Sequence, residues 1–213
     1  RPGELLQVAG IVAKERGNII KLEHNQFVNI NRQHGVELRV TLEAFGLVHK
    51  KEIMTALREA GCTVTADSGG IRALCRERLR AVGPVQTAPY PGFPTDAQAV
   101  LMAALLRSRG ATVFEENIFE NRYRHVDELI RMGASIRVSG RVAVVTGVER
   151  LHSAPVRCTD LRGGAALCVA ALAAEGETRV SQICHIDRGY EDLARDLRAL
   201  GADAVRVEET ENG

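Results

Sequence analysis

The chain has no tryptophan, and only 4% of its 213 residues are aromatic. Its core must therefore be built mainly from valine, isoleucine, leucine and alanine. No apolar run approaches the ~20 residues that cross a bilayer, and no basic block accompanies the net charge of +1. These absences argue against a membrane span and against a nucleic-acid partner.

The five cysteines are odd in number, and no two of them form a Cys-x-x-Cys pair. Such a set indicates reduced thiols with structural roles, because a disulfide framework or a zinc site uses paired cysteines. We expect no metal and no cofactor. Since no signal-peptide pattern is present either, a soluble cytoplasmic protein is the expectation.

What the sequence does contain is a repeated junction of a leucine, three residues, a glycine and a short strand-like run. Apolar residues at helical spacing precede each junction, and glycine ends a helix in a left-handed conformation without steric cost. The five junctions are Leu57 with Gly61, Leu106 with Gly110, Leu129 with Gly133, Leu172 with Gly176, and Leu197 with Gly201. The strand-like runs that follow them are 63–64, 112–113, 136–138, 179–180 and 205–207. This repetition predicts an α/β protein with internal duplication.

The starts of three helices are also marked in the sequence. Thr95 and Gln98 have the spacing of a capping box directly behind Pro94. Asp160 and Asp187 are expected just ahead of two later helices, at the positive end of each helix dipole.

Three polar segments interrupt the apolar periodicity and are candidate sites. The first, residues 87–98, places Asp96 in the first turn of the capped helix, behind three prolines. A carboxylate there is stabilised as the anion, so its simplest role is electrostatic. The functional alternative is a carboxylate aimed at a substrate hydroxyl, as hydrogen-bond acceptor or proton carrier.

The second polar segment, residues 116–125, contains two carboxylates, two amides, two arginines and a histidine. So many hydrogen-bonding groups are costly to bury without partners, which predicts a solvated loop or the wall of a site. His125 is interpreted as a residue at a helix start and not as a base.

The third segment, residues 159–166, is echoed by residues 185–190, and each contains an Asp and an Arg at a helix entrance beside glycine. Backbone N–H groups and a guanidinium there suit a phosphate or a carboxylate. Local Asp–Arg contacts that cap the helices are the simpler alternative. A further group of arginines is interpreted as a solvated hairpin and not as an anion site: Arg72, Arg76, Arg78 and Arg80.

The polar segments carry a resemblance that extends from about Leu57 to Val207. In order and spacing they resemble the bacterial UDP-N-acetylglucosamine 1-carboxyvinyltransferase family, more closely than its sibling acting on shikimate 3-phosphate. The matching runs are 93–96 with Gln98, 118–122, 125–134, 159–162 and 185–191. The resemblance implies an inside-out α/β fold of repeated βαβαββ units. It also implies transfer of an enolpyruvyl group from phosphoenolpyruvate to the 3-hydroxyl of UDP-N-acetylglucosamine, in peptidoglycan precursor synthesis.

The resemblance implies a role for each matching residue. Asp96 would hydrogen-bond the sugar hydroxyl and help to move its proton, and Ile118 would meet the nucleotide sugar through its backbone. Asp160 would position Arg162 or the reacting groups.

Three arginines would neutralise the carboxylate and phosphate of phosphoenolpyruvate, and these are Arg122, Arg162 and Arg188. The family's site lies between two domains. The Lys-Asn pair and the glycine-flanked cysteine or aspartate loop of the other domain have no counterpart here. The resemblance therefore predicts an incomplete site that is not active alone.

Residues 1–64 do not resemble the start of that transferase domain. They predict a helix that runs to Arg16, paired strands at 19–24 and 36–45, and a second helix at 49–60. In residues 1–5, 17–19 and 36–45 this segment resembles the ACT domain (ferredoxin-like) at the C-terminus of threonine dehydratases. ACT modules commonly bind amino acids, and Gly3, Asn18 and Ile19 would mark that site; packing alone is the simpler role.

We therefore divide the chain into a partial ACT-like segment, residues 1–64, and a partial enolpyruvyl transferase-like domain, residues 65–213. Three functions stay open at this point. The first is an enolpyruvyl transferase that needs a missing half. The second is an amino-acid-binding regulator that forms a homo-oligomer through the ACT-like segment, and the third is an inactive hybrid of the two.

Overall fold

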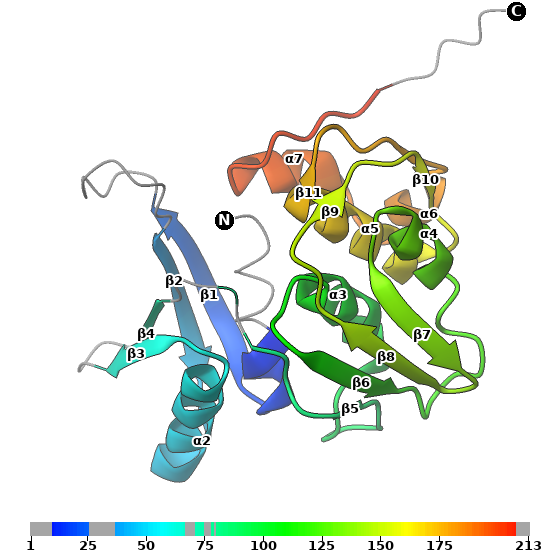
Figure 1. The fold of residues 1–213 in the computed structure, drawn as a ribbon. Helices are drawn as coiled ribbons and strands as arrows, with labels where there is room; N and C mark the ends of the chain where they lie inside the picture. Colours follow the sequence, from blue (N-terminus) through cyan, green and yellow to red (C-terminus); the bar gives the residue numbers. More distant parts are fainter. Residues whose placement is uncertain (1–9, 26–36, 67–70, 75–77, 79, 208–213) are drawn as a thin grey trace, which may run out of the picture.

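The computed structural model describes residues 10–25, 37–66, 71–74, 78 and 80–207. Two hydrophobic clusters divide these residues into a smaller N-terminal part and a larger C-terminal part, which lie side by side (Figure 1). Within these ranges no helix is both long and apolar enough to cross a bilayer.

The N-terminal part begins with a helical turn at residues 10–14. Its further elements are β1 (Asn18–Asn25), β2 (Glu37–Glu43), α2 (Gly46–Glu59), β3 (Thr63–Ala66) and β4 (Ile71–Leu74). Strands β1 and β2 are antiparallel, as are β3 and β4. Its core joins the helical turn, α2 and β3 through Ile11, Val12, Ile53, Leu57, Ala60, Cys62 and Val64. The predicted order of helix, strand, strand, helix and strand is confirmed.

The C-terminal part contains one complete βαβαββ unit, as the resemblance implied. Its elements are β5 (Val85–Gln86), α3 (Thr95–Leu105), β6 (Ala111–Glu115), α4 (Val126–Arg131), β7 (Ser135–Ser139) and β8 (Val142–Thr146). The sheet has the order β5-β6-β8-β7. Strand β5 is parallel to β6, whereas β8 is antiparallel to both of its neighbours.

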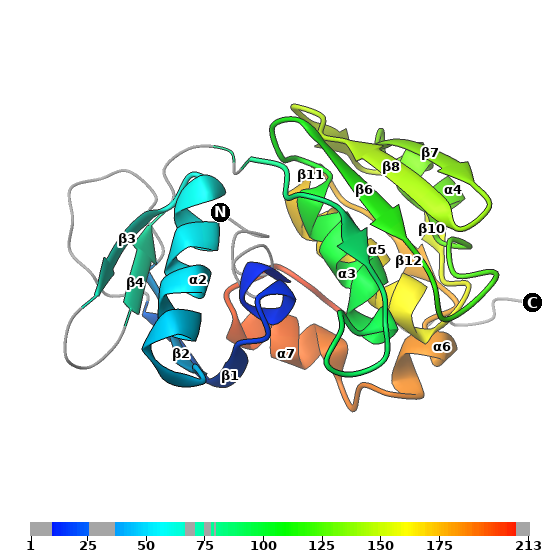
Figure 2. The same cartoon turned by 90° about the horizontal axis from the view of Figure 1, so that it is seen from below.

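The main core lies between this sheet and two helices. Alternate residues of β6 and β8 face inward, among them Phe114, Ala143 and Val145. Helix α3 and helix α5 (Leu161–Ala173) pack side by side beneath that face (Figure 2). Both helices are rich in alanine, whose small side chain lets two helices approach closely.

The remaining elements form a second, shorter set around α5. They are β9 (Leu151–His152), β10 (Val156–Arg157), β11 (Ala174–Glu175), β12 (Val180–Ser181), α6 (Cys184–Asp187) and α7 (Leu193–Ala199). Strand β9 pairs with β11 and β10 pairs with β12, both in parallel. The chain after α5 therefore runs alongside the chain before it, and α6 packs against α5.

Three of the five predicted helix-ending glycines are confirmed, because Gly61, Gly133 and Gly201 directly follow the C-caps of α2, α4 and α7. The prediction is wrong for the other two, since Gly110 lies four residues beyond the C-cap of α3 and Gly176 follows β11. All five have φ between +88° and +104°, namely Gly61, Gly110, Gly133, Gly176 and Gly201. At Gly133 the backbone N–H bonds to the carbonyl of Ile130, and the following N–H of Ala134 bonds to that of Leu129. These bonds close the last turn of α4 and aim the chain into β7.

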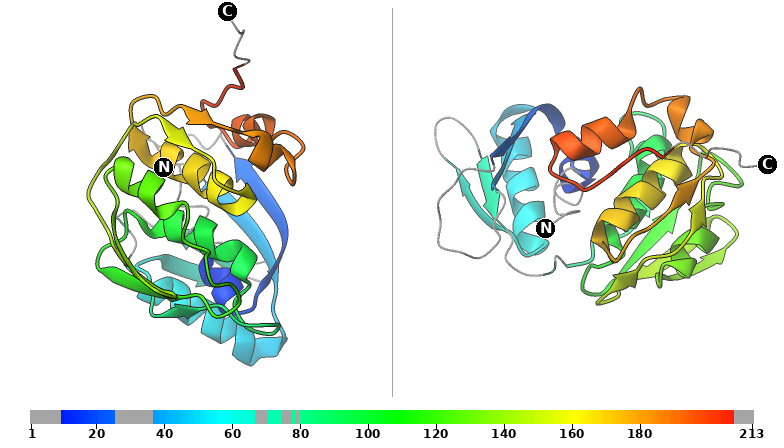
Figure 3. Two further views of the ribbon diagram at one scale, coloured as in Figure 1. Left: turned by 90° about the vertical axis from the view of Figure 1, so that its right-hand side faces the viewer. Right: turned by 90° about the horizontal axis from the view of Figure 1, so that it is seen from above.

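Four of the five predicted strand runs are confirmed as β3, β6, β7 and β12, and the fifth is wrong. Residues 205–207 lie outside every strand that the structure describes, and Val205 and Val207 are 73% and 67% exposed. A strand forms only along a neighbour. This segment instead runs as a tail past α7 (Figure 3), where Arg206 pairs with Asp187 at 2.8 Å.

Two of the predicted helix starts are also wrong in detail. Pro94 is the N-cap of α3, and the Thr95 hydroxyl donates to Glu116 at 2.9 Å instead of closing a capping box. Asp187 lies at the end of α6, not ahead of the next helix, which Asp192 caps. Asp160 is confirmed as the N-cap of α5.

Arg78 joins the two parts of the protein. Its guanidinium donates to the carbonyls of Arg107, Ser108 and Val148 at 2.8, 3.1 and 2.9 Å. The prediction of a solvated hairpin is therefore wrong for this arginine, because its guanidinium is hydrogen-bonded to backbone carbonyls of the C-terminal part. The side chains of Arg72 and Arg76 lie outside the described residues.

Candidate functional site

A pocket of about 560 Å³ opens where four segments of the C-terminal part meet. They are the first turn of α3, the loop after β6, the first turn of α5 and the end of α6. Its lining residues are Asp96, Arg122, Arg124, Thr159, Asp160, Leu161, Arg162, His185 and Arg188. Five of the six predicted transferase residues thus share one pocket, and the sixth, Ile118, belongs to the same loop as Arg122.

Asp96 bridges two arginines from different parts of the chain. Its Oδ1 accepts from Nη2 of Arg122 at 2.8 Å, and its Oδ2 accepts from Nη2 of Arg162 at 2.9 Å. The hydrogen bond from Arg162 and the charges of both guanidiniums hold the pKa of Asp96 below its usual range. The carboxylate is therefore the anion at neutral pH, and each guanidinium has a fixed direction.

Arg122 is held from two sides. One side is Asp96, and the other is the ring of Phe119, whose centroid lies 5.0 Å from the guanidinium carbon. Stacking of this kind restricts a flexible side chain while it leaves its outer N–H groups free to bind an anion. The loop after β6 therefore presents its arginine in a defined position.

Asp160 organises the start of α5. Its Oδ1 accepts from the backbone N–H groups of Arg162 at 3.0 Å and Gly163 at 2.8 Å, and its Oδ2 accepts from the Thr159 hydroxyl at 3.2 Å. Burial alone would raise the pKa of Asp160, but the hydrogen bonds from Gly163 and Thr159 outweigh it and lower the pKa. Asp160 thus positions Arg162 through the backbone.

Replacing Asp160 with alanine is expected to destabilise the protein by about 1 kcal/mol at neutral pH, the typical cost of a lost N-cap. Because the folded pKa lies below the unfolded value of about 3.9, the contribution is complete above that value and disappears as pH falls through the folded pKa. Urea unfolding of both proteins at neutral and acid pH would measure this. Asp203→Ala, at an exposed position outside the helices, is the control and is expected to leave the stability unchanged. An undiminished difference at acid pH would contradict the assignment.

Glu116 is a buried carboxylate, outside the pocket lining, that the sequence did not single out. It is 1% exposed and accepts four hydrogen bonds. The signal was present, because Thr112, Phe114 and Glu116 continue the inward alternation of β6. Glu116 accepts from the Ile118 N–H at 2.9 Å, so this backbone donor is already bonded within the protein.

Two other predictions concern residues near the pocket. His125 directly precedes α4, as expected for a helix start, and it is fully buried. Burial lowers the pKa of His125 to about 4, so the imidazole is neutral at physiological pH.

Burial also raises the pKa of Cys158 to about 12 and of Cys168 to about 11, which makes both poor nucleophiles, in agreement with structural roles.

The predicted amino-acid site is described only in part. Gly3 lies outside the described residues, and Asn18 and Ile19 begin β1 with only their backbone described. Across the described ranges no group of three or more His, Cys, Asp or Glu side chains could hold a metal ion.

Comparison with known proteins gives a family match over most of the chain. The model of the EPSP synthase (3-phosphoshikimate 1-carboxyvinyltransferase) family matches residues 36–197, beginning inside the segment expected to be ACT-like. A UDP-N-acetylglucosamine 1-carboxyvinyltransferase of Myxococcus xanthus is 53% identical over 158 residues, 74% of this chain and 37% of that protein. One of Desulfofundulus thermocisternus is 54% identical over 164 residues, 75% of this chain and 65% of that protein.

Solved structures agree with this match. The enolpyruvyl transferase NikO from Streptomyces tendae has a TM-score of 0.59 and 33% identity, over 70% of this chain and 34% of that one. EPSP synthase from Acinetobacter baumannii, with a TM-score of 0.51 and 17% identity over 96% of this chain and 44% of that one, shares the fold. The chain thus spans less than two thirds of the length of these relatives. It belongs to the EPSP synthase family of carboxyvinyltransferases.

Proposed function

We propose that this chain provides one wall of an enolpyruvyl transferase site, which takes phosphoenolpyruvate and UDP-N-acetylglucosamine and serves peptidoglycan precursor synthesis. The names of the relatives at 53% and 54% identity, both UDP-N-acetylglucosamine 1-carboxyvinyltransferases, support this choice of substrates. The observation that carries the proposal is the carboxylate of Asp96 held between Arg122 and Arg162 in one pocket.

The charges of the pocket suit phosphoenolpyruvate. That substrate has a carboxylate and a phosphate, and guanidinium groups bind both through paired N–H donors. Arg122, Arg162 and Arg188 reach the pocket from three different segments. In our proposal they hold the two acidic groups at once, while Asp160 fixes the backbone that carries Arg162.

In the net reaction, the sugar 3-oxygen forms a bond to C2 of the enolpyruvyl group, and the bond from C2 to the phosphate oxygen breaks. The hydroxyl proton ends on the released phosphate. Asp96 accepts the hydrogen bond of that hydroxyl and carries its proton. A carboxylate between two arginines is a weak base, because their charge lowers its pKa. When the anionic groups of phosphoenolpyruvate bind Arg122 and Arg162 in place of Asp96, the pKa of Asp96 rises and its carboxylate becomes a stronger base.

The N-terminal part has its own proposed role. The order of β1, β2, α2 and β3 supports an ACT-like segment with an amino-acid ligand near Gly3, Asn18 and Ile19, and a homo-oligomer formed through it. Calorimetry with threonine, isoleucine and valine tests this role. Absence of heat with all three would remove it.

Calorimetry of the full chain with phosphoenolpyruvate and with UDP-N-acetylglucosamine tests the transferase proposal. We expect saturable binding of phosphoenolpyruvate, competition by inorganic phosphate, and slow or no phosphate release when both substrates are present. A chain with Arg131→Ala should bind both substrates as the wild type does, because this arginine is 65% exposed and outside the pocket lining. A chain that binds neither substrate and releases no phosphate would refute the proposal.

A further inference from the structure

The buried carboxylate of Glu116 joins three separate segments of the C-terminal part. Oε1 accepts from the Thr87 hydroxyl, just after β5, at 2.9 Å. The same oxygen accepts from the backbone N–H groups of Ile118 and Phe119 at 2.9 and 3.1 Å. Oε2 accepts from the hydroxyl of Thr95, the first residue of α3, at 2.9 Å. One side chain therefore links the sheet, the loop after β6 and helix α3.

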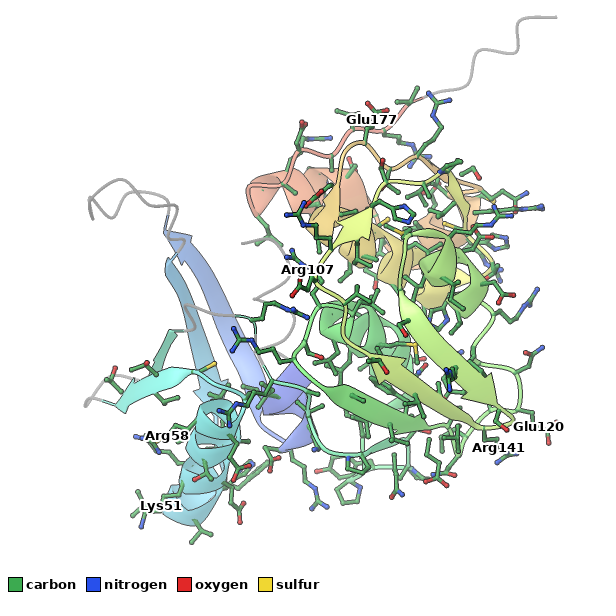
Figure 4. The ribbon with its side chains drawn as sticks, in the orientation of Figure 1. Lys51, Arg58, Arg107, Glu120, Arg141 and Glu177 are labelled. Carbon is green, nitrogen blue, oxygen red and sulfur yellow. The ribbon has the colours of Figure 1, made fainter. Side chains whose placement is uncertain are left out.

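The loop after β6 is also fastened on its other side. The Glu116 N–H donates to the carbonyl of Arg141 at 2.8 Å, and the Tyr123 hydroxyl lies 3.1 Å from the same carbonyl. The Arg141 side chain lies beside Glu120 at this end of the sheet, at 3.5 Å (Figure 4). The loop is thus anchored to the sheet, and the bond between Glu116 and Thr95 connects it to α3.

Burying a charged carboxylate costs free energy, so packing alone does not explain a glutamate at a position that is 1% exposed. All four donors are uncharged, so the burial of the charge is offset by hydrogen bonds alone. Hydrogen bonds to a charged acceptor are short and directional, and they fix the segments that supply the donors. The arrangement therefore controls distances between segments.

We propose that Glu116 is a positioning residue that sets the first turn of α3 against the loop after β6, and thereby holds Asp96 against Arg122. The hydrogen bond from the Thr95 hydroxyl to Glu116, at 2.9 Å, connects the segment that carries Asp96 to the segment that carries Arg122. Helix α3 carries Asp96 one residue after Thr95. The loop carries Arg122 six residues after Glu116. The consequence for catalysis rests on the proposed function, whereas the geometric claim stands independently of it.

The test changes Thr95, because its hydroxyl is the contact between Glu116 and α3. Thr95→Val keeps the shape of the side chain and removes the donor, while Thr95→Ser keeps the donor. In the full chain, carboxyl titration by NMR measures the pKa of Asp96 in each protein. We expect Thr95→Val to raise it toward the ordinary value, because α3 and Arg122 lose their alignment, and Thr95→Ser to retain the wild-type value.

Neither variant changes a charge, so a shift in the pKa of Asp96 reports geometry. Thr112→Val is the matched control, because it removes another buried hydroxyl, which donates to the Val82 carbonyl at 3.1 Å, and it is expected to leave the alignment intact. Wild-type titration of Asp96 in Thr95→Val, together with a lower melting temperature, would show a purely structural role and overturn the proposal. Thr95→Ala replaces Thr95→Val if the latter does not fold.

A second measurement separates this inference from the proposed function. If the chain binds phosphoenolpyruvate, Thr95→Val is expected to weaken that binding about fivefold, the effect of one hydrogen bond. If the wild-type chain binds no phosphoenolpyruvate, the proposed function fails. The NMR titration then still decides whether Glu116 positions Asp96.

Discussion

Replacing Arg162 with methionine is expected to weaken phosphoenolpyruvate binding by roughly 10- to 100-fold, because hydrogen bonds between charged groups contribute about 1.5–3 kcal/mol. Methionine matches the length of the side chain and removes the charge. Arg162 is the suitable target because it lines the pocket and is held in place by Asp96 at 2.9 Å. Calorimetry with phosphoenolpyruvate at constant salt concentration measures the loss.

Two further variants make the result specific. Arg162→Lys keeps the charge and loses the planar pair of donors, so we expect an intermediate affinity. Arg131→Met removes an exposed arginine whose nearest carboxylate is Glu128 at 3.8 Å, and it should bind as the wild type does. Equal affinities for Arg162→Met and Arg131→Met would exclude Arg162 from the anion site.

Gly147→Ala is expected to destabilise the protein by about 3 kcal/mol or more, the upper range for overpacking. A Cβ atom there would lie 1.7 Å from the carbonyl oxygen of Ser108 and 2.6 Å from its carbonyl carbon. Both are backbone atoms, so no side-chain rotation relieves the clash. The Gly147 N–H donates to the carbonyl of Gly110 at 2.9 Å, and a shift of Gly147 away from Ser108 would disturb this hydrogen bond. Urea unfolding measures the change.

Gly140→Ala provides the comparison for this variant. Gly140 has φ of +58° and open space around the position of a Cβ, so only backbone strain of about 1–2 kcal/mol is expected. The two losses should therefore differ clearly. Similar values would show that the loop at Gly147 moves away from Ser108 at little cost.

Features that depend on neighbouring residues in the sequence were predicted well. The leucine–glycine junctions predicted positive φ at five glycines, and all five adopt it, although only Gly61, Gly133 and Gly201 directly follow a helix. The complete βαβαββ unit and the grouping of Asp96, Arg122, Arg162 and Arg188 were implied by the family resemblance, and the pocket contains all four. The assigned roles and the division at residue 64 stay predictions.

Features that depend on distant partners were missed. Thr95 has the local spacing of a helix cap, but its hydroxyl donates to Glu116 across the fold. Asp187 precedes a helix in the sequence, yet it accepts from Arg206 in the tail. In both cases, the competing contact comes from a segment whose position only the folded chain fixes. Spacing along the sequence contains no information about it.

The bridge formed by Asp96 also affects how the pocket selects among anions. Arg122 and Arg162 already have a carboxylate as their counter-ion, at 2.8 and 2.9 Å. An anion from solution must therefore exchange with that carboxylate instead of adding to two bare cations. Chloride, with one charge and no paired oxygen atoms, gains little from this exchange, whereas a ligand with a carboxylate and a phosphate satisfies several guanidinium donors. In our proposal, the built-in counter-ion thus keeps the pocket available for a ligand with both a carboxylate and a phosphate in a solution rich in simple salts.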